Sequence, residues 1–150
     1  MEREIKLRLI KHVAFLESEL QDFPNFRSLL WEDYQKERAK RRNVERWIEN
    51  IVNSSIDLSK ILLVSENIPV ADTYKELVVS ISLVPGFDRE RVQKLSEWVR
   101  FRNIIAHEYL DTRWASIKRF IEEAEPLYKS FLVDVKKYLS SHFEADFSKT

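Results

Sequence analysis

Hydrophobic residues recur every three or four positions over most of the chain, which is the spacing of one face of an α-helix. The first such stripe predicts a helix that ends near Asp22, because Pro24 disfavours a helical backbone at the residue before it. A short turn of helix is expected from Phe26 to Trp31. The stripe comprises Ile5, Leu9, Val13, Leu16, Leu20 and Phe23.

The second stripe lies in a segment from Asp33 to Glu66 that contains no glycine or proline. It predicts one helix on the order of 30 residues, or ~45 Å at ~1.5 Å per residue, of which part would protrude or pack on a partner chain. Asn67-Ile68-Pro69 ends it. The stripe comprises Val44, Trp47, Ile48, Ile51, Val52, Leu58, Ile61 and Leu62, with Ser55 in register.

The next helix is predicted to begin at Asp72 or Thr73, with Glu76 placed for a capping box. Residues 78–84 are β-branched and partly alternating, so a strand is the alternative. We favour a helix because no partner strand is visible elsewhere. Pro85-Gly86 would end it.

Asp88 is predicted to open a helix that runs directly into residues 102–109. Asp111-Thr112 would then cap a last amphipathic helix, which Pro126 should kink or divide in two. The tail from Glu144 is expected to fray. The pattern predicts an all-α chain, a single up-and-down bundle of about five to six helices that forms one domain over residues 1–150.

Composition agrees with this fold class, since the chain is 44% hydrophobic and 33% charged, with one glycine and four prolines. There is no cysteine, which excludes disulfides, thiolate metal sites and cysteine nucleophiles and favours a reducing compartment. No signal peptide and no membrane-spanning segment are recognisable, so we expect a cytoplasmic protein without membrane contact.

Lys plus Arg and Asp plus Glu number 25 each, so the net charge is zero and any RNA contact must come from a local patch. The candidate patch consists of Lys40, Arg41, Arg42 and Arg46, within a basic stretch of residues 36–46. A solvated helix face explains the same residues equally well.

The string Arg102-Asn103-Ile104-Ile105-Ala106-His107-Glu108-Tyr109 gathers the most chemically capable side chains. Arg102 and His107 would lie ~140° apart on a straight helix, whereas Asn103 and His107 share a face. Therefore either the helix breaks just before His107 or two chains assemble the site. In a two-fold dimer, two arginines and two histidines could surround one phosphate.

These residue types suit RNA cleavage without a metal. A histidine can take the proton of the ribose 2′-hydroxyl or give one to the leaving oxygen. An arginine can hold the phosphate through two hydrogen bonds and stabilise its developing charge. A structural role for an arginine and a histidine near a helix end remains the alternative.

The spacing Arg102-x4-His107-x-Tyr109 resembles the signature of the HEPN superfamily, specifically its HepT-like branch. Residues 43–46, which open the long helix, and residues 72–76, which open the next, follow the order and spacing of that family. The resemblance implies a homodimeric, metal-independent endoribonuclease that needs no cofactor and acts as the toxin of a toxin–antitoxin pair. It also implies a partner, a MntA-type nucleotidyltransferase antitoxin that adds AMP to the motif tyrosine.

Carried over by position, the resemblance makes Arg102 the phosphate-binding catalytic arginine and His107 the catalytic histidine. Asn103 matches a supporting polar residue, and Tyr109 matches the acceptor of AMP. An added nucleotidyl group there would bring bulk and negative charge to a phosphate-binding cleft. Two other functions remain open, an inactive helical dimer that docks a nucleotidyltransferase and a nucleotide-binding dimer.

Other candidate residues carry weaker signals. We expect His12 and His142 to be bystanders, and we disfavour a metal site at His107, Glu108 and Asp111 because no second histidine follows at the required spacing. Trp47 and Trp98 fall on apolar stripes and should be core or dimer interface, whereas Trp31 and Trp114 stay undecided. Glu45-Arg46 could pair with motif residues or with neighbours on its own helix.

Overall fold

The computed structural model describes residues 2–143, and within them every regular element is helical. The elements are α1 (Glu2–Leu20), α2 (Phe23–Arg27), α3 (Trp31–Lys36), α4 (Arg38–Ser65), α5 (Tyr74–Ser80), η1 (Ile81–Leu83), α6 (Arg89–Glu97), η2 (Trp98–Arg100), α7 (Phe101–His107) and α8 (Leu110–Phe143). The predicted all-α fold class is confirmed.

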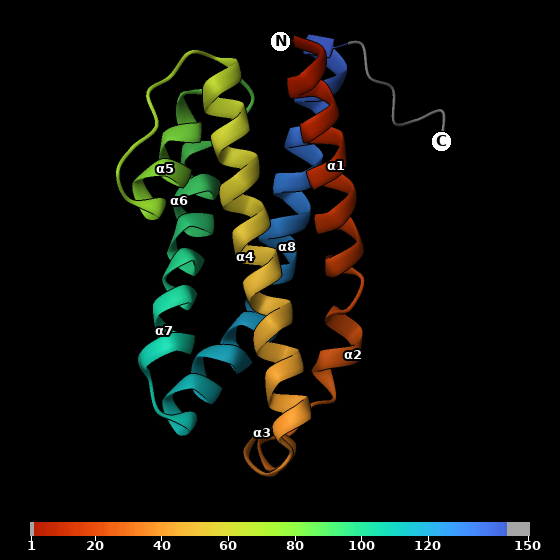
Figure 1. Cartoon of the computed structure of the whole chain (residues 1–150), viewed down its shortest axis with the longest axis vertical. Helices are drawn as coiled ribbons and strands as arrows, with labels where there is room; N and C mark the ends of the chain where they lie inside the picture. Colours follow the sequence, from red (N-terminus) through yellow and green to blue (C-terminus); the bar gives the residue numbers. More distant parts are fainter. Residues whose placement is uncertain (1, 144–150) are drawn as a thin grey trace.

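The long helices alternate in direction, as an up-and-down bundle requires (Figure 1). In Figure 1, α1 descends, α4 rises through the centre, the segment from α5 to α7 descends on the far side of α4, and α8 rises behind. Helix α4 packs against α1, α3, α5 and α7, so it connects the two halves of the molecule. The start of α1 and the end of α8 lie together, at the opposite end from the C-terminus of α7.

The core is built from the predicted apolar stripes. Trp47 and Trp98 are 3% and 9% exposed, which places both in the core of the chain. Ser55 is buried in register and donates to the carbonyl of Val52 at 2.7 Å. Rings pack edge to face around Phe120, with Phe101 at 5.4 Å and Trp47 at 5.7 Å between centroids.

The prediction of one uninterrupted helix from Asp33 is wrong at its start. Glu37 has an extended backbone that separates α3 from α4, and α4 alone has 28 residues. Side chains stabilise this break, which no glycine or proline marks. The guanidinium of Arg41 donates to the carbonyls of Tyr34 and Gln35 at the end of α3. At the start of α3, the carboxylate of Asp33 accepts from the backbone N–H of Leu30.

Two of the prolines lie within helices. Helix α1 ends at Leu20, close to the expected Asp22, but Pro24 lies in the first turn of α2, so the short helix begins three residues before the expected Phe26. Of the two outcomes predicted for Pro126, the division of the last helix is wrong, since α8 is continuous over 34 residues. The bend of α8 along its length agrees with the other outcome, a kink (Figure 1). That helix begins at Leu110, which puts the expected cap residue Asp111 inside its first turn.

Most of the predictions for residues 67–88 are confirmed. Thr73 caps α5 by accepting from the N–H of Glu76 at 3.2 Å, and Asp88 caps α6 by accepting from the N–H of Arg91 at 3.0 Å. Residues 78–83 are helical, partly as a 3₁₀ turn, and Val84 ends that turn with an extended backbone, so the strand alternative is excluded. Gly86 adopts a φ of 96°, which its missing side chain allows.

The predicted helix from Asp88 to His107 is interrupted by the 3₁₀ turn η2, so the motif belongs to a separate short helix. None of the described helices combines the length and apolar character needed to cross a bilayer. The predicted fraying from Glu144 lies outside the described residues.

Candidate functional site

Helix α7 presents the motif on its solvent side. Phe101 is 1% exposed and anchors the helix, and Ile105 packs against the core from the same side. The side chains of Arg102, Asn103, Ala106 and His107 are all exposed. Although Arg102 and His107 are ~140° apart, they therefore border one exposed face, with the small Ala106 between them.

The helix does not break before His107. His107 is the last residue of α7, and Glu108 has the extended backbone that ends it. The sequence left two ways to bring Arg102 and His107 together, a break of the helix before His107 or a second chain. The predicted break is wrong. Within one chain the two side chains lie on the exposed surface of α7.

A partly buried ion pair holds the motif segment against the bundle. Arg113 of α8 donates to the carboxylate of Glu45 of α4 at 2.9 Å and to the backbone carbonyl of Ile105 at 3.4 Å. The two side chains are 21% and 13% exposed. The hydroxyl of Tyr34 donates to the same Glu45 oxygen. Within residues 2–143, Glu45 therefore pairs with Arg113 of α8 and not with a residue of the motif, and its only link to the motif segment is the bond from Arg113 to the carbonyl of Ile105.

This arrangement changes the chemistry of Tyr34. Burial raises the pKa of its hydroxyl above the ordinary value, and the hydrogen bond to Glu45 raises it further. Tyr34 therefore acts as a donor that helps to fix Glu45. The rings of Trp31 and Trp114, for which the sequence favours neither role, pack on Tyr34 at 6.2 and 5.3 Å, so both are partly buried neighbours of this ion pair.

Arg102 is held by an aromatic ring. Its guanidinium carbon lies 4.4 Å from the ring centroid of Tyr74, the first residue of α5. Such a cation–π contact restricts the guanidinium without neutralising its charge. The sequence does not reveal this contact of Tyr74, although the residue belongs to the segment 72–76 that follows the family pattern.

Tyr109 lies in the short connection between α7 and α8 and is 84% exposed. No other large hydrophobic side chain of the described residues is as exposed. A tyrosine in this position is open to a modifying enzyme or to a second protein chain.

The four residues of the basic patch do not act together. Lys40 pairs with Glu37 at 3.2 Å and with Asp33 at 3.7 Å, and Arg41 is used by the carbonyls at the end of α3. Arg42 and Arg46 are exposed, without an ion-pair partner within residues 2–143. Only these two remain free to contact a phosphate.

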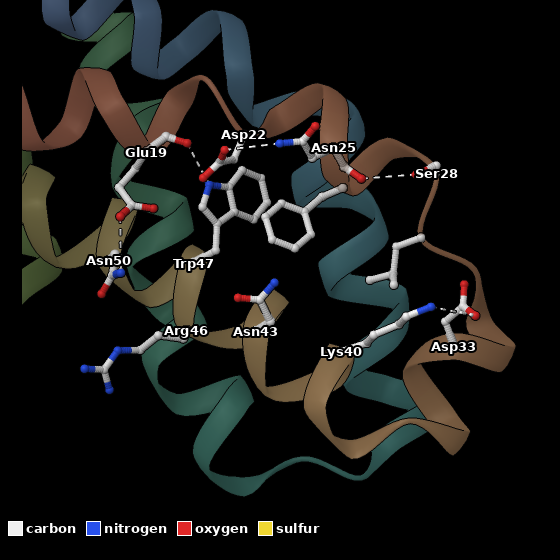
Figure 2. A pocket seen from close by; sticks show the side chains of 12 residues that line it. Glu19, Asp22, Asn25, Ser28, Asp33, Lys40, Asn43, Arg46, Trp47 and Asn50 are labelled. Carbon is white, nitrogen blue, oxygen red and sulfur yellow. Dashed lines mark hydrogen bonds and ion pairs between the residues drawn. The ribbon is translucent and has the colours of Figure 1, made fainter.

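A cavity of about 520 Å³ lies between α4 and the segment from α1 to α3 (Figure 2). Its lining mixes Lys40 and Arg46 with the carboxylates of Glu19, Asp22 and Asp33, and it contains no motif residue. In Figure 2, Lys40 points toward Asp33, whereas the guanidinium of Arg46 points away from both. The carboxylates make this cavity a poor site for a polyanion.

The two remaining histidines lie apart from the motif. His12 lines a shallow groove between α1 and α4, and His142 stacks on the ring of Tyr138 at 3.9 Å near the end of α8. Within residues 2–143, no group of three or more histidine, aspartate or glutamate side chains is placed to hold a metal ion.

Comparison with known proteins identifies the family. The family model described as "Ribonuclease HepT-like" matches residues 16–135, which include α4 and the whole motif. No curated protein matches the chain. The resemblance inferred from the motif is confirmed, and the chain belongs to the HepT-like ribonuclease family.

Proposed function

We propose that this protein is a metal-independent endoribonuclease, the toxin of a toxin–antitoxin pair, in which Arg102 and His107 carry out the reaction. The observation that carries the proposal is the exposed face of α7, where Arg102 and His107 flank Ala106 in a family of ribonucleases. The ion pair of Glu45 and Arg113 supports it, because it fixes the backbone of this short helix from behind.

In the reaction, His107 removes the proton of the ribose 2′-hydroxyl, and the oxygen attacks the adjacent phosphorus. Arg102 binds the non-bridging oxygens and stabilises their charge. The bond to the 5′-oxygen breaks, and that oxygen takes a proton from a second imidazole. The products are a 2′,3′-cyclic phosphate and a 5′-hydroxyl. Asn103, one helical turn before His107, would orient the imidazole or the substrate.

Two chains supply the two imidazoles. The face formed by Arg102, Ala106 and His107 is open, and the small Ala106 allows the same helix of a second chain to approach closely. In a two-fold dimer, each motif would contribute an arginine and a histidine to one cleft. A monomer by light scattering at micromolar concentration would contradict this composite site.

Tyr109 is the proposed point of control. A MntA-type nucleotidyltransferase would transfer AMP to its hydroxyl, releasing pyrophosphate from ATP. The exposure of 84% leaves the hydroxyl accessible, and the added phosphate would repel RNA from the neighbouring cationic residues. Incubation with such an enzyme and ATP should add AMP to wild type and none to Tyr109→Phe, as measured by mass spectrometry.

The chemical groups at the ends of the cleaved RNA test this mechanism. A 5′-labelled RNA cut by the wild type should carry a 2′,3′-cyclic phosphate, and Arg102→Ala should cut about 100-fold more slowly or worse, since one charge-stabilising donor is worth on the order of 10²–10³ in rate. Products ending in a 3′-hydroxyl would refute the mechanism. An unmodified dimer that binds RNA without cutting it would favour an inactive binding protein.

A further inference from the structure

Two cations from different helices meet on one aromatic ring next to the motif. Tyr74 begins α5 and is 44% exposed. The guanidinium carbon of Arg102 lies 4.4 Å from its ring centroid, and Nζ of Lys60 of α4 lies 5.4 Å from the same centroid. The two positive charges are therefore separated by no more than the sum of these distances.

Among the described residues, no carboxylate pairs with either cation. Neither Lys60 nor Arg102 has an ion-pair partner among residues 2–143, whereas Lys94 and Lys129 on α6 and α8 each pair with a glutamate. Two like charges this close repel one another. The negative faces of the Tyr74 ring attract both cations, offset part of that repulsion and hold both side chains beside the ring. Two unpaired positive charges held at a defined position are suited to bind an anion such as a phosphate.

We propose that Lys60 is a second phosphate-binding residue of the RNA site, and that Tyr74 is the positioning residue that holds Lys60 and Arg102 for adjacent phosphates of one strand. The inference rests on the proposed ribonuclease function and extends it to the path of the substrate. RNA would cross the surface formed by α4, the start of α5 and α7. A lysine ammonium acts as a point charge, so Lys60 would contribute affinity without selecting a base.

The chain offers a matched control. Lys75 is the next residue along α5, is exposed and has no ion-pair partner among the described residues, but it does not lie over the ring. Lys60→Ala and Lys75→Ala remove the same charge from neighbouring positions. Tyr74→Phe keeps the ring, and Tyr74→Leu removes it. Because Tyr74 is half exposed, its replacement should leave the melting temperature nearly unchanged, which is checked for each variant.

The experiment measures binding of a fluorescent 2′-O-methyl oligoribonucleotide by anisotropy over a series of salt concentrations. This probe lacks the nucleophile, so binding is measured whether or not the protein cleaves RNA. Lys60→Ala should weaken binding about fivefold at low salt and reduce the slope of log K against log salt by about 0.7, the value for one phosphate contact on a single strand. Tyr74→Leu should weaken binding to a similar degree, and combining it with Lys60→Ala should weaken binding by less than the product of the two effects.

Equal slopes for Lys60→Ala and Lys75→Ala would overturn the assignment of Lys60. Equal binding by Tyr74→Leu and Tyr74→Phe would overturn the positioning role of the ring. If the wild type failed to bind the oligonucleotide, the ribonuclease proposal would fall and this inference with it. If Lys60→Ala alone weakened binding but wild type left ordinary RNA intact, the phosphate site would stand without the catalytic proposal.

Discussion

The ion pair between Glu45 and Arg113 should be a main determinant of stability, although it joins two side chains near the surface. Truncation in Glu45→Ala would leave the guanidinium of Arg113 without its carboxylate and the hydroxyl of Tyr34 without its acceptor. Breaking a fully buried pair costs about 3–5 kcal/mol. With the two side chains 13% and 21% exposed, water compensates part of that loss, and we expect about 2–4 kcal/mol for this pair.

Thermal and urea unfolding followed by circular dichroism would measure this effect. For a chain of this size, 1 kcal/mol lowers the melting temperature by roughly 2–4 °C, so Glu45→Ala should melt about 5–15 °C below wild type. Glu45→Gln keeps an oxygen acceptor, so its melting temperature should lie between those of wild type and Glu45→Ala. In a double-mutant cycle, Arg113→Ala should cost less in the Glu45→Ala background than alone, because the unpaired charge is then removed.

The matched control is Glu49→Ala, one turn along α4, at a residue without an ion-pair partner among those described. A substitution at such a position should change stability by less than about 0.5 kcal/mol. If Glu45→Ala and Glu49→Ala melted within experimental error of each other, the ion pair would be an ordinary surface pair. It would then not be what holds α7 against the bundle.

Three further predictions concern other parts of the molecule. Tyr128 is fully buried and its hydroxyl has no hydrogen-bond partner in good geometry among the described residues, so Tyr128→Phe should be neutral or stabilising by up to about 1 kcal/mol in urea unfolding. Burial raises the pKa of the Tyr128 hydroxyl, and nearby Ser55 offsets only part of this rise. The folded protein therefore holds the hydroxyl proton more tightly than the unfolded chain does. The resulting contribution of Tyr128 to stability is present below about pH 10 and is lost as the pH rises further. Tyr128→Phe should therefore flatten the alkaline decline in stability by up to about 1.4 kcal/mol per pH unit, and an unchanged decline would contradict this. On α4, Arg42→Ala and Arg46→Ala should weaken RNA binding without loss of stability. Arg41→Ala should instead lower the melting temperature, because it removes the donor to two carbonyls of α3. The reverse pattern would refute the assignment of Arg41 to structure and of Arg42 and Arg46 to RNA binding.

Much of the fold could be predicted because its determinants are local. The apolar stripes of α1, α4 and α8 follow helical spacing. Thr73 and Asp88 cap the N-termini of α5 and α6, which directly follow them in the chain. The break at Glu37 could not be predicted, because it depends on Arg41 reaching back to carbonyls of α3 once both helices have formed. The 3₁₀ turn at Trp98–Arg100 similarly has no glycine or proline to mark it.

The site could be predicted only as far as it is continuous in sequence. Residues 102–109 could be recognised as one string, and the structure leaves the side chains of Arg102, Asn103 and His107 exposed on α7. The groups that hold that face come from residues far away in the chain. Glu45 reaches it through Arg113, and Lys60 reaches it through Tyr74, so neither could be linked to the motif before the helices were placed.

The central claim is that His107 cleaves RNA without a metal. The most direct measurement is a time course of cleavage of labelled RNA in excess EDTA, by protein made without a partner and shown by mass spectrometry to carry no AMP on Tyr109. Wild type and the bystander variant His12→Ala should cut at the same rate, and His107→Ala should be slower by about 100-fold or more. Loss of wild-type cleavage in EDTA, or equal rates for His107→Ala and His12→Ala, would contradict the claim.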